Sequence, residues 1–396
     1  MNKYRTLKSI FHEEGERAAL EIYQQRLNSE ASYQFPFSIQ DHPCFVFPCK
    51  EINAAMDSIH KKNAKLHFLM NDLPYASVLL IDSLLTEIEM SNEIEGIHSS
   101  RRELREVLGI SMQAKSRFAG MVSQYMKLIS DTPHPFPKNP EEIRKIYDEM
   151  FLDEVIENDA KNQPDGIYFR TNPVYVVDGR GTRHTGVLPE EKIIEMLNQA
   201  LGMMSDSELP GLIKIAVFHF IFGYIHPFYD GNGRMSRYLS AVGLMQDLGM
   251  PAAMHISLAL REKRSQYYKS FEACEHELNY SDLTPFVIFF LKALDDALQH
   301  EIDLLEDKKM NLNNYQTKIK KMTKEKSTAE SDFLNLLAFY TLFSTDGARK
   351  KEIARQLEKN ENSVNNLIKK YQKYIFSRQE GRFKNYMLKD TFLSDN

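Results

Sequence analysis

Residues 225–237, IHPFYDGNGRMSR, place the strongest constraint on how this chain can fold. The apolar run before them, Ile213 to Ile225, is too short to span a bilayer and contains Lys214 and His219, so it predicts a buried helix. Pro227 stops that helix, and two glycines turn the chain before a second helical pattern, RMSRYLSAVGLMQDLG. The stretch therefore predicts two helices joined by a short polar loop.

The rest of the chain favours a mainly α, soluble protein. Helical periodicity is common and strand signals are rare over the 396 residues. A net charge of −5 indicates no general attraction to nucleic acid, so any basic surface must be local. The 3 cysteines are too few for a disulfide framework, and the N-terminus lacks a signal peptide. We expect a cytoplasmic protein without membrane attachment.

The loop chemistry favours a bound anion. Gly231 and Gly233 allow a tight turn in which successive backbone N–H groups can point toward one place. The loop ends at a helix N-terminus, where unpaired N–H groups and the helix dipole attract negative charge. Arg234 and Arg237 are three residues apart on that helix and can face the same group. Their guanidinium forks match phosphate oxygens.

Two further side chains suggest phosphate chemistry rather than anion binding alone. A polyphosphate would repel Asp230 unless a divalent cation lay between them, and one carboxylate plus phosphate oxygens is a common Mg²⁺ arrangement. His226 stands at the mouth of the loop. With a pKa near neutrality, its imidazole would be suited to accept a proton.

These residues resemble the signature of the Fic family, histidine-proline-phenylalanine-x-acid-glycine-asparagine-glycine-arginine-x-x-arginine. The similarity to this family extends over roughly residues 75–297. All nine defined positions of the signature are matched here, by His226, Pro227, Phe228, Asp230, Gly231, Asn232, Gly233, Arg234 and Arg237. The resemblance implies transfer of AMP from ATP, with Mg²⁺, to a Ser, Thr or Tyr hydroxyl of a target protein.

The resemblance also implies a role for each matched residue. His226 would be the general base and Asp230 would hold Mg²⁺. Arg234 would contact the β-phosphate and Arg237 the γ-phosphate. The α-phosphate would be received by an anion hole in the backbone of Gly231, Asn232 and Gly233.

Two other features fit the same family less closely. A predicted hairpin at 174–184, turning at Asp178-Gly179-Arg180-Gly181, lies where the family places a flap that aligns the target peptide. Tyr267 matches a tyrosine that lines the adenosine pocket in relatives. Glu275 stands where some relatives have an asparagine, which puts that adenine contact in doubt.

An upstream helix, expected at about 82–97, resembles the inhibitory helix of the family. Its pattern, Ser/Thr-x-x-x-Glu-Gly/Asn, is matched by Ser91, Glu95 and Gly96. Ser91 and Glu95 share one helix face, and Gly96 can end the helix. The resemblance implies that Glu95 pairs with Arg237 and so prevents that arginine from holding the γ-phosphate. We therefore expect an autoinhibited enzyme.

The expected domains are a helical N-terminal region (1–130), a Fic core (131–300), a charged linker (301–330) and a C-terminal domain (331–396). The charge of 306–330 fits a solvated helix as well as a linker. The last resembles a winged helix-turn-helix. Residues 344–390 carry 12 Lys and Arg against 6 Asp and Glu, which favours DNA as a partner of 331–390. The side chains expected to reach DNA from its second helix are Ser363, Asn365, Asn366, Lys369 and Lys370.

Alternative functions remain open at this point. The chain could be a DNA-binding regulator whose Fic domain senses nucleotide, although a sensor would not need His226. The same site could also remove AMP from a modified protein, with Glu95 positioning a water. The target, which can be the chain itself, is not identified. Relatives often form homodimers, and the sequence leaves the oligomeric state open.

Overall fold

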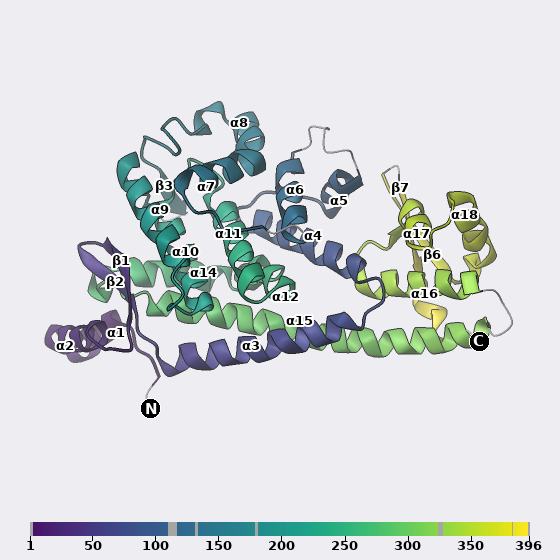
Figure 1. Cartoon of the computed structure of the whole chain (residues 1–396), viewed down its shortest axis with the longest axis horizontal. Coiled ribbons are helices and arrows are strands. Elements are labelled where there is room, and N and C mark those ends of the chain that lie inside the picture. The colour runs from purple at the N-terminus through teal and green to yellow at the C-terminus, as the bar shows by residue number, and fades with distance from the viewer. Residues whose placement is uncertain are drawn as a thin grey trace. The chain divides into compact units, whose positions relative to one another are not determined.

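The computed structural model describes residues 3–109, 117–130, 134–178, 181–323, 328–381 and 383–394. It is mainly helical, with three small antiparallel sheets in the described ranges, so the mainly α prediction is confirmed (Figure 1). The chain divides into two compact units. The first comprises Met1–Ala64 and Thr86–Leu298, and the second comprises Lys65–Leu85 and Gln299–Asn396. Within the described ranges, no helix has both the length and the apolar character needed to cross a bilayer.

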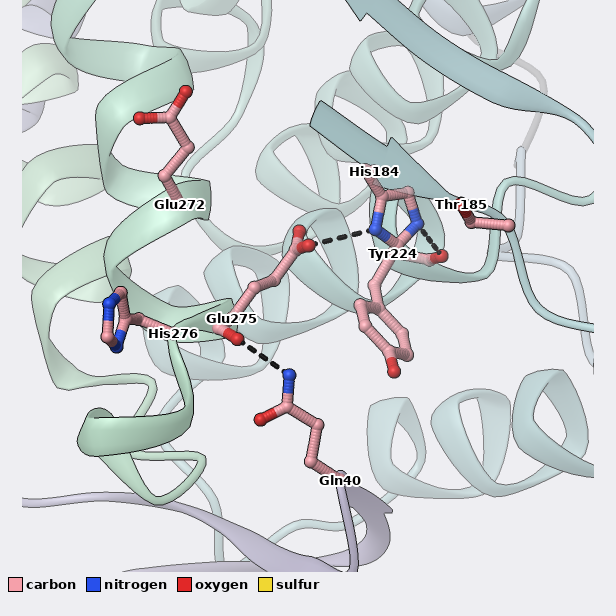
Figure 2. A pocket seen from close by; sticks show the side chains of 7 residues that line it. All are labelled: Gln40, His184, Thr185, Tyr224, Glu272, Glu275 and His276. Carbon is pink, nitrogen blue, oxygen red and sulfur yellow. Dashed lines mark hydrogen bonds and ion pairs between the residues drawn. The ribbon is translucent and has the colours of Figure 1, made fainter. Parts of the chain in front are cut away.

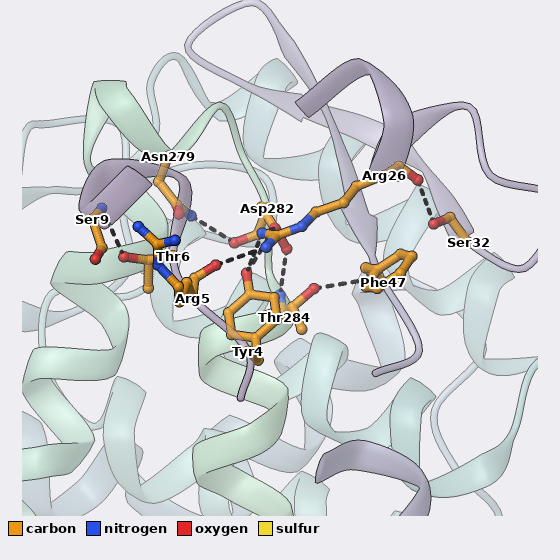
Figure 3. Close-up of polar contacts among 10 residues, drawn as sticks. All are labelled: Tyr4, Arg5, Thr6, Ser9, Arg26, Ser32, Phe47, Asn279, Asp282 and Thr284. Atoms are coloured by element: carbon orange, nitrogen blue, oxygen red, sulfur yellow. Dashed lines mark hydrogen bonds and ion pairs between the residues drawn. The ribbon is translucent and has the colours of Figure 1, made fainter. Parts of the chain in front are cut away.

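The first unit begins with a small subdomain of two helices and a hairpin: α1 (Leu7–Glu14), α2 (Glu16–Leu27), β1 (Tyr33–Ile39) and β2 (His42–Val46). Its attachment depends on Asp282, which is buried in the loop before α15 (Figure 3). Arg26 donates to Asp282 over 3.1 Å, and the hydroxyl of Tyr4 donates to it over 2.7 Å. Removing one partner of such a buried ion pair is strongly destabilising, so these contacts help to secure residues 3–46 to the unit.

The remaining helices of the first unit surround α10 and α11. Helix α10 (Gly211–Ile225) is apolar on all sides and buried, as expected for a central helix, and α11 (Asn232–Asp247) packs beside it. The other elements that lie wholly in this unit are listed here in chain order: α5 (Arg101–Gly109), α6 (Ala119–Leu128), α7 (Pro140–Tyr147), the π-helical turn η1 (Asp148–Leu152), α8 (Asp153–Asn158), η2 (Ala160–Asn162), β3 (Tyr175–Asp178), β4 (Gly181–Thr185), α9 (Glu190–Met204), α12 (Met250–Ala253), α13 (Ile256–Glu262), α14 (Arg264–Glu275) and η3 (Glu277–Asn279).

Three helices contribute residues to both units: α3 (Lys50–Asn71), α4 (Ala76–Ile94) and α15 (Thr284–Met322). The division therefore differs from the predicted one, because most of the 1–130 region joins the 131–300 core in the first unit.

Of the two structures expected for the charged segment 301–330, a linker or a solvated helix, the structure shows a helix as far as Met322. Helix α15 continues to Met322, and residues 324–327 lie outside the described residues. Leu305, Leu312 and Ile319 are buried at a spacing of seven. Such spacing keeps one helix face apolar even where the segment as a whole is highly charged.

The second unit ends in helices and a three-stranded sheet of order β5-β7-β6. Helices α17 and α18 stand where the sequence predicts a helix-turn-helix, and the β6–β7 hairpin stands where it predicts a wing. The elements are α16 (Thr328–Phe343), β5 (Ala348–Arg349), α17 (Lys350–Gln356), α18 (Glu361–Lys370), η4 (Gln372–Tyr374), β6 (Ile375–Glu380), β7 (Phe383–Leu388) and η5 (Asp390–Phe392).

Candidate active site

The loop between α10 and α11 is held in one shape by its own residues. His226 is the residue that ends α10, and its backbone lies in the left-handed region at φ 53°. Pro227, which follows, cannot continue the helix. Gly231, at φ 81°, precedes the first turn of α11. The Asn232 side chain accepts from the Phe228 N–H over 2.9 Å and donates to the Phe228 carbonyl over 2.8 Å. Asn232 therefore braces the loop.

The imidazole of His226 lies in an environment that the sequence did not predict. Its Nδ1 lies 3.3 Å from the Gly223 carbonyl oxygen. Burial lowers the pKa of His226 to about 4, because the charged form loses its hydration. The expected pKa near neutrality is therefore wrong, and the ring is neutral over the physiological pH range.

Arg170 fixes the backbone around His226 and was not predicted. Its buried guanidinium donates only to carbonyl oxygens, those of His226 (2.8 Å), Asn172 (2.9 Å), Val187 (2.9 Å) and Ile225 (3.2 Å). It thus ties the end of α10 to the chain on both sides of the β3–β4 hairpin. Nothing in the local sequence around Arg170 signals this role.

Aromatic stacking supports the other side of the loop. The rings of Tyr147 and Phe228 are parallel, with centroids 3.6 Å apart. The Tyr147 hydroxyl donates to the Asp230 carbonyl over 3.1 Å. The Asp230 carboxylate accepts from the Gly231 N–H over 2.5 Å, and no ion pair holds it among the described residues.

Arg234 is wholly buried and contacts an acid that the sequence did not single out. Its Nη1 donates to Oε2 of Glu154 over 2.8 Å, and Glu154 is itself 4% exposed. The Nε and Nη2 atoms of Arg234 are buried and have no hydrogen-bond partner among the described residues.

Arg237 is equally buried, but α4 occupies one edge of its guanidinium. Nε donates to the Ser91 hydroxyl over 3.0 Å, and Nη2 donates to the Ser91 carbonyl and to Oε1 of Glu95, each over 2.8 Å. Nη1 is left without a partner in the described chain. Burial tends to raise the pKa of Glu95, but the charge and hydrogen bond of Arg237 outweigh it, so the pKa is lowered. Glu95 is therefore ionised, and Gly96 follows the helix in the left-handed region at φ 73°.

Gly233 provides the space in which Glu95 lies. A Cβ atom at this position would collide with the Glu95 carboxylate and come within 3.1 Å of Nη1 of Arg237. The absent side chain at Gly233 thus leaves a hollow that now holds a carboxylate.

Tyr267 is buried, and its hydroxyl lies 2.7 Å from Nε2 of His219, whose Nδ1 lies 2.8 Å from the Ser240 hydroxyl. His219 is thus a buried core residue with a hydrogen-bond partner at each ring nitrogen. The role of Tyr267 in lining a pocket for the base stays a prediction.

A cavity of about 420 Å³ lies beside β4, and Glu275 is one of the residues that line it (Figure 2). His184 on β4 contacts Oε2 of Glu275 through Nδ1 over 2.8 Å and the Tyr224 carbonyl through Nε2 over 2.6 Å. Burial opposes charge on His184, but the hydrogen bond and charge of Glu275 raise its pKa. The β3–β4 hairpin is present as predicted, and its turn residues Gly179 and Arg180 lie outside the described residues. The side chain of Gln40, from the β1–β2 turn, completes the rim.

Comparison with known proteins agrees with the loop geometry. Residues 137–244 match the model of the Fic/DOC family.

The chain contains a Fic domain.

Related proteins share this domain over limited lengths. The chain is 28% identical over 180 residues to protein adenylyltransferase fic-1 of Caenorhabditis elegans, covering 43% of this chain and 32% of that protein. It is 31% identical over 134 residues to protein adenylyltransferase Fic of Drosophila mojavensis, covering 34% and 24%. The chain thus spans about a third or less of the length of these curated relatives.

A solved structure supports the fold. The crystal structure of a Fic family protein from Desulfovibrio desulfuricans covers 90% of this chain and 99% of its own, with a TM-score of 0.52 and 17% identity. The two chains therefore share a fold, although their sequences have diverged.

Proposed function

We propose that this chain transfers AMP from ATP to a hydroxyl group of a protein and that Glu95 restrains the reaction. One observation carries the proposal: two buried arginines, Arg234 and Arg237, hold guanidinium N–H groups without partners next to the Gly233 hollow and the His226 loop. Buried cationic donors are costly unless an anion satisfies them. A polyphosphate supplies such an anion, and the relatives named adenylyltransferases favour ATP.

In this mechanism the neutral imidazole of His226 accepts the proton of the incoming hydroxyl. The oxygen attacks the α-phosphorus, the bond to the bridging oxygen of the β-phosphate breaks, and pyrophosphate leaves. Backbone N–H groups at the start of α11, from Gly231, Asn232 and Gly233, would stabilise the charge that develops on the α-phosphate. Arg234 and Arg237 would hold the β- and γ-phosphates.

Asp230 would hold Mg²⁺ in the same proposal. Its carboxylate faces the loop and has no ion-pair partner among the described residues, which suits a cation shared with phosphate oxygens. Mg²⁺ would neutralise charge on the leaving group when bound.

The restraint follows from the edge of Arg237 that Glu95 and Ser91 occupy. A guanidinium binds phosphate best through two parallel N–H groups, and Nε and Nη2 of Arg237 are both in use. The Glu95 carboxylate also lies in the hollow at Gly233, where it would repel a phosphate. We therefore propose low activity for the unmodified chain.

The test uses α-labelled ATP with a proteome as acceptor. The Glu95→Gly protein should label itself or other proteins, and the Glu95→Gly, His226→Ala double variant should not. Mass spectrometry of the labelled products would identify the target and the modified residue. An inactive Glu95→Gly protein that still binds ATP would contradict the restraint, and one that binds no ATP would contradict the function. Release of AMP from a purified labelled product, assayed with the unmodified chain and with Glu95→Gly, would reveal an activity that removes AMP by hydrolysis.

We also propose that the second unit binds DNA. Asn362, Asn366 and Lys369 are exposed at helical spacing on one face of α18, and the segment 344–390 is basic. The other side chains named from the sequence are less available, because Ser363 and Asn365 are half-buried and Lys370 pairs with Glu330. Anisotropy with random duplex DNA at several salt concentrations tests this. Lys369→Ala should weaken binding and Lys320→Ala on α15 should not.

A cytoplasmic location is part of the proposal. Cys44, Cys49 and Cys274 are buried free thiols, and burial raises the pKa of Cys49 and Cys274. Such thiols are inert and suit a reducing compartment. Fractionation of cells that express the chain would test the location.

A further inference from the structure

One complete edge of the Arg234 guanidinium is buried without a hydrogen-bond partner in the described chain. Nε and Nη2 lie on the same side of the group, and these are the two atoms without a partner in the described chain. Such an edge donates two parallel N–H groups, which is the geometry that grips two oxygens of one phosphate. The third nitrogen, Nη1, is the one that Glu154 holds.

Phe151 and Glu154 come from two adjacent elements, the π-helical turn η1 and α8, and both contact Arg234. The Phe151 ring lies under the Arg234 guanidinium, 4.8 Å from centroid to Cζ, while Glu154 holds its end. Insertions of this kind into helices are frequent at functional sites because they redirect side chains.

The second oxygen of Glu154 faces another cation. Nε of Arg117 lies 3.6 Å from Oε1 of Glu154, which is an ion pair but too long for a hydrogen bond. A buried carboxylate that contacts two arginines can define the orientation of Arg234.

Arg234 and Arg237, the two candidate phosphate-binding residues, thus contact their acidic partners through different nitrogens. Glu95, with Ser91, occupies the two-nitrogen edge of Arg237. Glu154 contacts only the single nitrogen of Arg234 that lies off that edge. The contact of Glu95 with Arg237 therefore competes with an anion. The contact of Glu154 with Arg234 leaves Nε and Nη2 without a partner in the described chain.

We propose that Glu154 is a positioning residue that holds Arg234 with its Nε–Nη2 edge directed at the β-phosphate of the nucleotide. The role rests on the proposed function for the identity of the ligand. Glu154 remains paired with Arg234 when the nucleotide is bound and is not released with Glu95.

The test compares three ligands on the Glu95→Gly protein: ATP with Mg²⁺, AMP and inorganic tripolyphosphate. Calorimetric titration would be repeated with Glu154→Ala, Glu154→Asp and Glu154→Gln. Alanine removes the acceptor, aspartate retracts the carboxylate by one methylene, and glutamine keeps an oxygen that can accept from Nη1. Glu157→Ala, exposed on the same helix α8, is the matched control.

The alanine and aspartate variants should bind ATP and tripolyphosphate roughly tenfold more weakly or worse, since a charge-assisted bidentate contact is misaligned. AMP lacks the β-phosphate, so its affinity should change less than about twofold. Glutamine should restore most of the affinity, and the Glu157 control should match the parent. If the Glu154→Ala variant does not fold, the contrast between Glu154→Asp and Glu154→Gln still tests the positioning role.

Equal losses for ATP and AMP, or no loss in alanine and aspartate, would overturn the positioning role. Tighter ATP binding by glutamine would also overturn it, because that result identifies Glu154 as a second restraint. If the variants show the expected pattern with tripolyphosphate while Glu95→Gly transfers no AMP, the proposed function fails and the positioning role stands. If the Glu95→Gly protein itself binds no polyphosphate, both the positioning role and the proposed function are overturned.

Discussion

The Nη2 atom of Arg237 on α11 lies 2.8 Å from Oε1 of Glu95, the residue that directly follows α4, and this ion pair joins residues 142 positions apart. The same guanidinium donates twice to Ser91. Because the arginine is fully buried, its three bonds to Ser91 and Glu95 must be broken or exchanged for bonds to a ligand before its two-nitrogen edge can serve another anion.

Glu95→Gln should therefore raise the rate of AMP transfer, by about tenfold or more, because it removes the charge that holds Arg237. Ser91→Ala should have a smaller effect, since the Ser91 carbonyl still accepts from Nη2. Initial rates of label incorporation measure both. Glu93→Gln is the matched control, because Glu93 lies on the same helix but pairs with the exposed Arg261. Activation of the control to the level of Glu95→Gln would show that loosening α4, rather than freeing Arg237, raises the rate.

The pH profile of the activated enzyme should lack an inflection near neutrality. A general base works when deprotonated, and burial lowers the pKa of His226 to about 4. Loss of the Glu95 charge, which raises this pKa, lowers it further in Glu95→Gly. The rate should be nearly constant from about pH 5.5 to 8 and fall as pH approaches the His226 pKa. A midpoint near the ordinary histidine value in kcat/KM would contradict the neutral, dehydrated ring.

Gly233→Ala should not substitute for loss of the inhibitory acid. The new methyl group would displace the Glu95 carboxylate, but it would fill the hollow that we assign to phosphate. In the Glu95→Gly background we expect ATP affinity to fall on the order of tenfold. Gly202→Ala on α9 is the control, since a Cβ atom there meets no other atom within 4 Å. Unchanged ATP affinity in Gly233→Ala would place the nucleotide elsewhere.

Glu87 should make the folded chain less stable as pH rises. Burial raises the pKa of this carboxyl from 4.5 to about 7, against hydrogen bonds from the Ser257 hydroxyl and N–H that lower it. Between these values the unfolded chain loses the proton and the folded chain keeps it, so the free energy of unfolding falls as pH increases. The loss is about 3 kcal/mol between pH 4.5 and 7.

Glu87→Gln should remove this slope. Urea unfolding at pH 5 and pH 8 would show a smaller pH-dependent loss of stability in the variant than in the parent. Equal losses in the two proteins would indicate that Glu87 is ionised in the folded state at both pH values.

The sequence was most informative where one short segment holds all the parts. The motif at 226–237, the helices on either side of it and the β3–β4 hairpin were predictable, because turn residues and apolar periodicity act locally. Glu154 and Arg170 were not, since their partners are 80 and 56 positions away along the chain and no local pattern marks them.

Burial limited other predictions, because it changes what a residue can do. His226 was given an ordinary pKa, which assumes hydration that the site removes. The charged segment after residue 300 left a linker and a solvated helix open, because its charge masks a stripe of three buried residues, Leu305, Leu312 and Ile319.

The left-handed backbone of His226 has a thermodynamic consequence. A side chain at φ 53° destabilises the native state by about 1 kcal/mol relative to glycine. Between two variants that both lack an imidazole, His226→Gly should consequently melt at a higher temperature than His226→Ala. That difference in melting temperature would measure the stability that the chain loses by keeping a proton acceptor at this left-handed position.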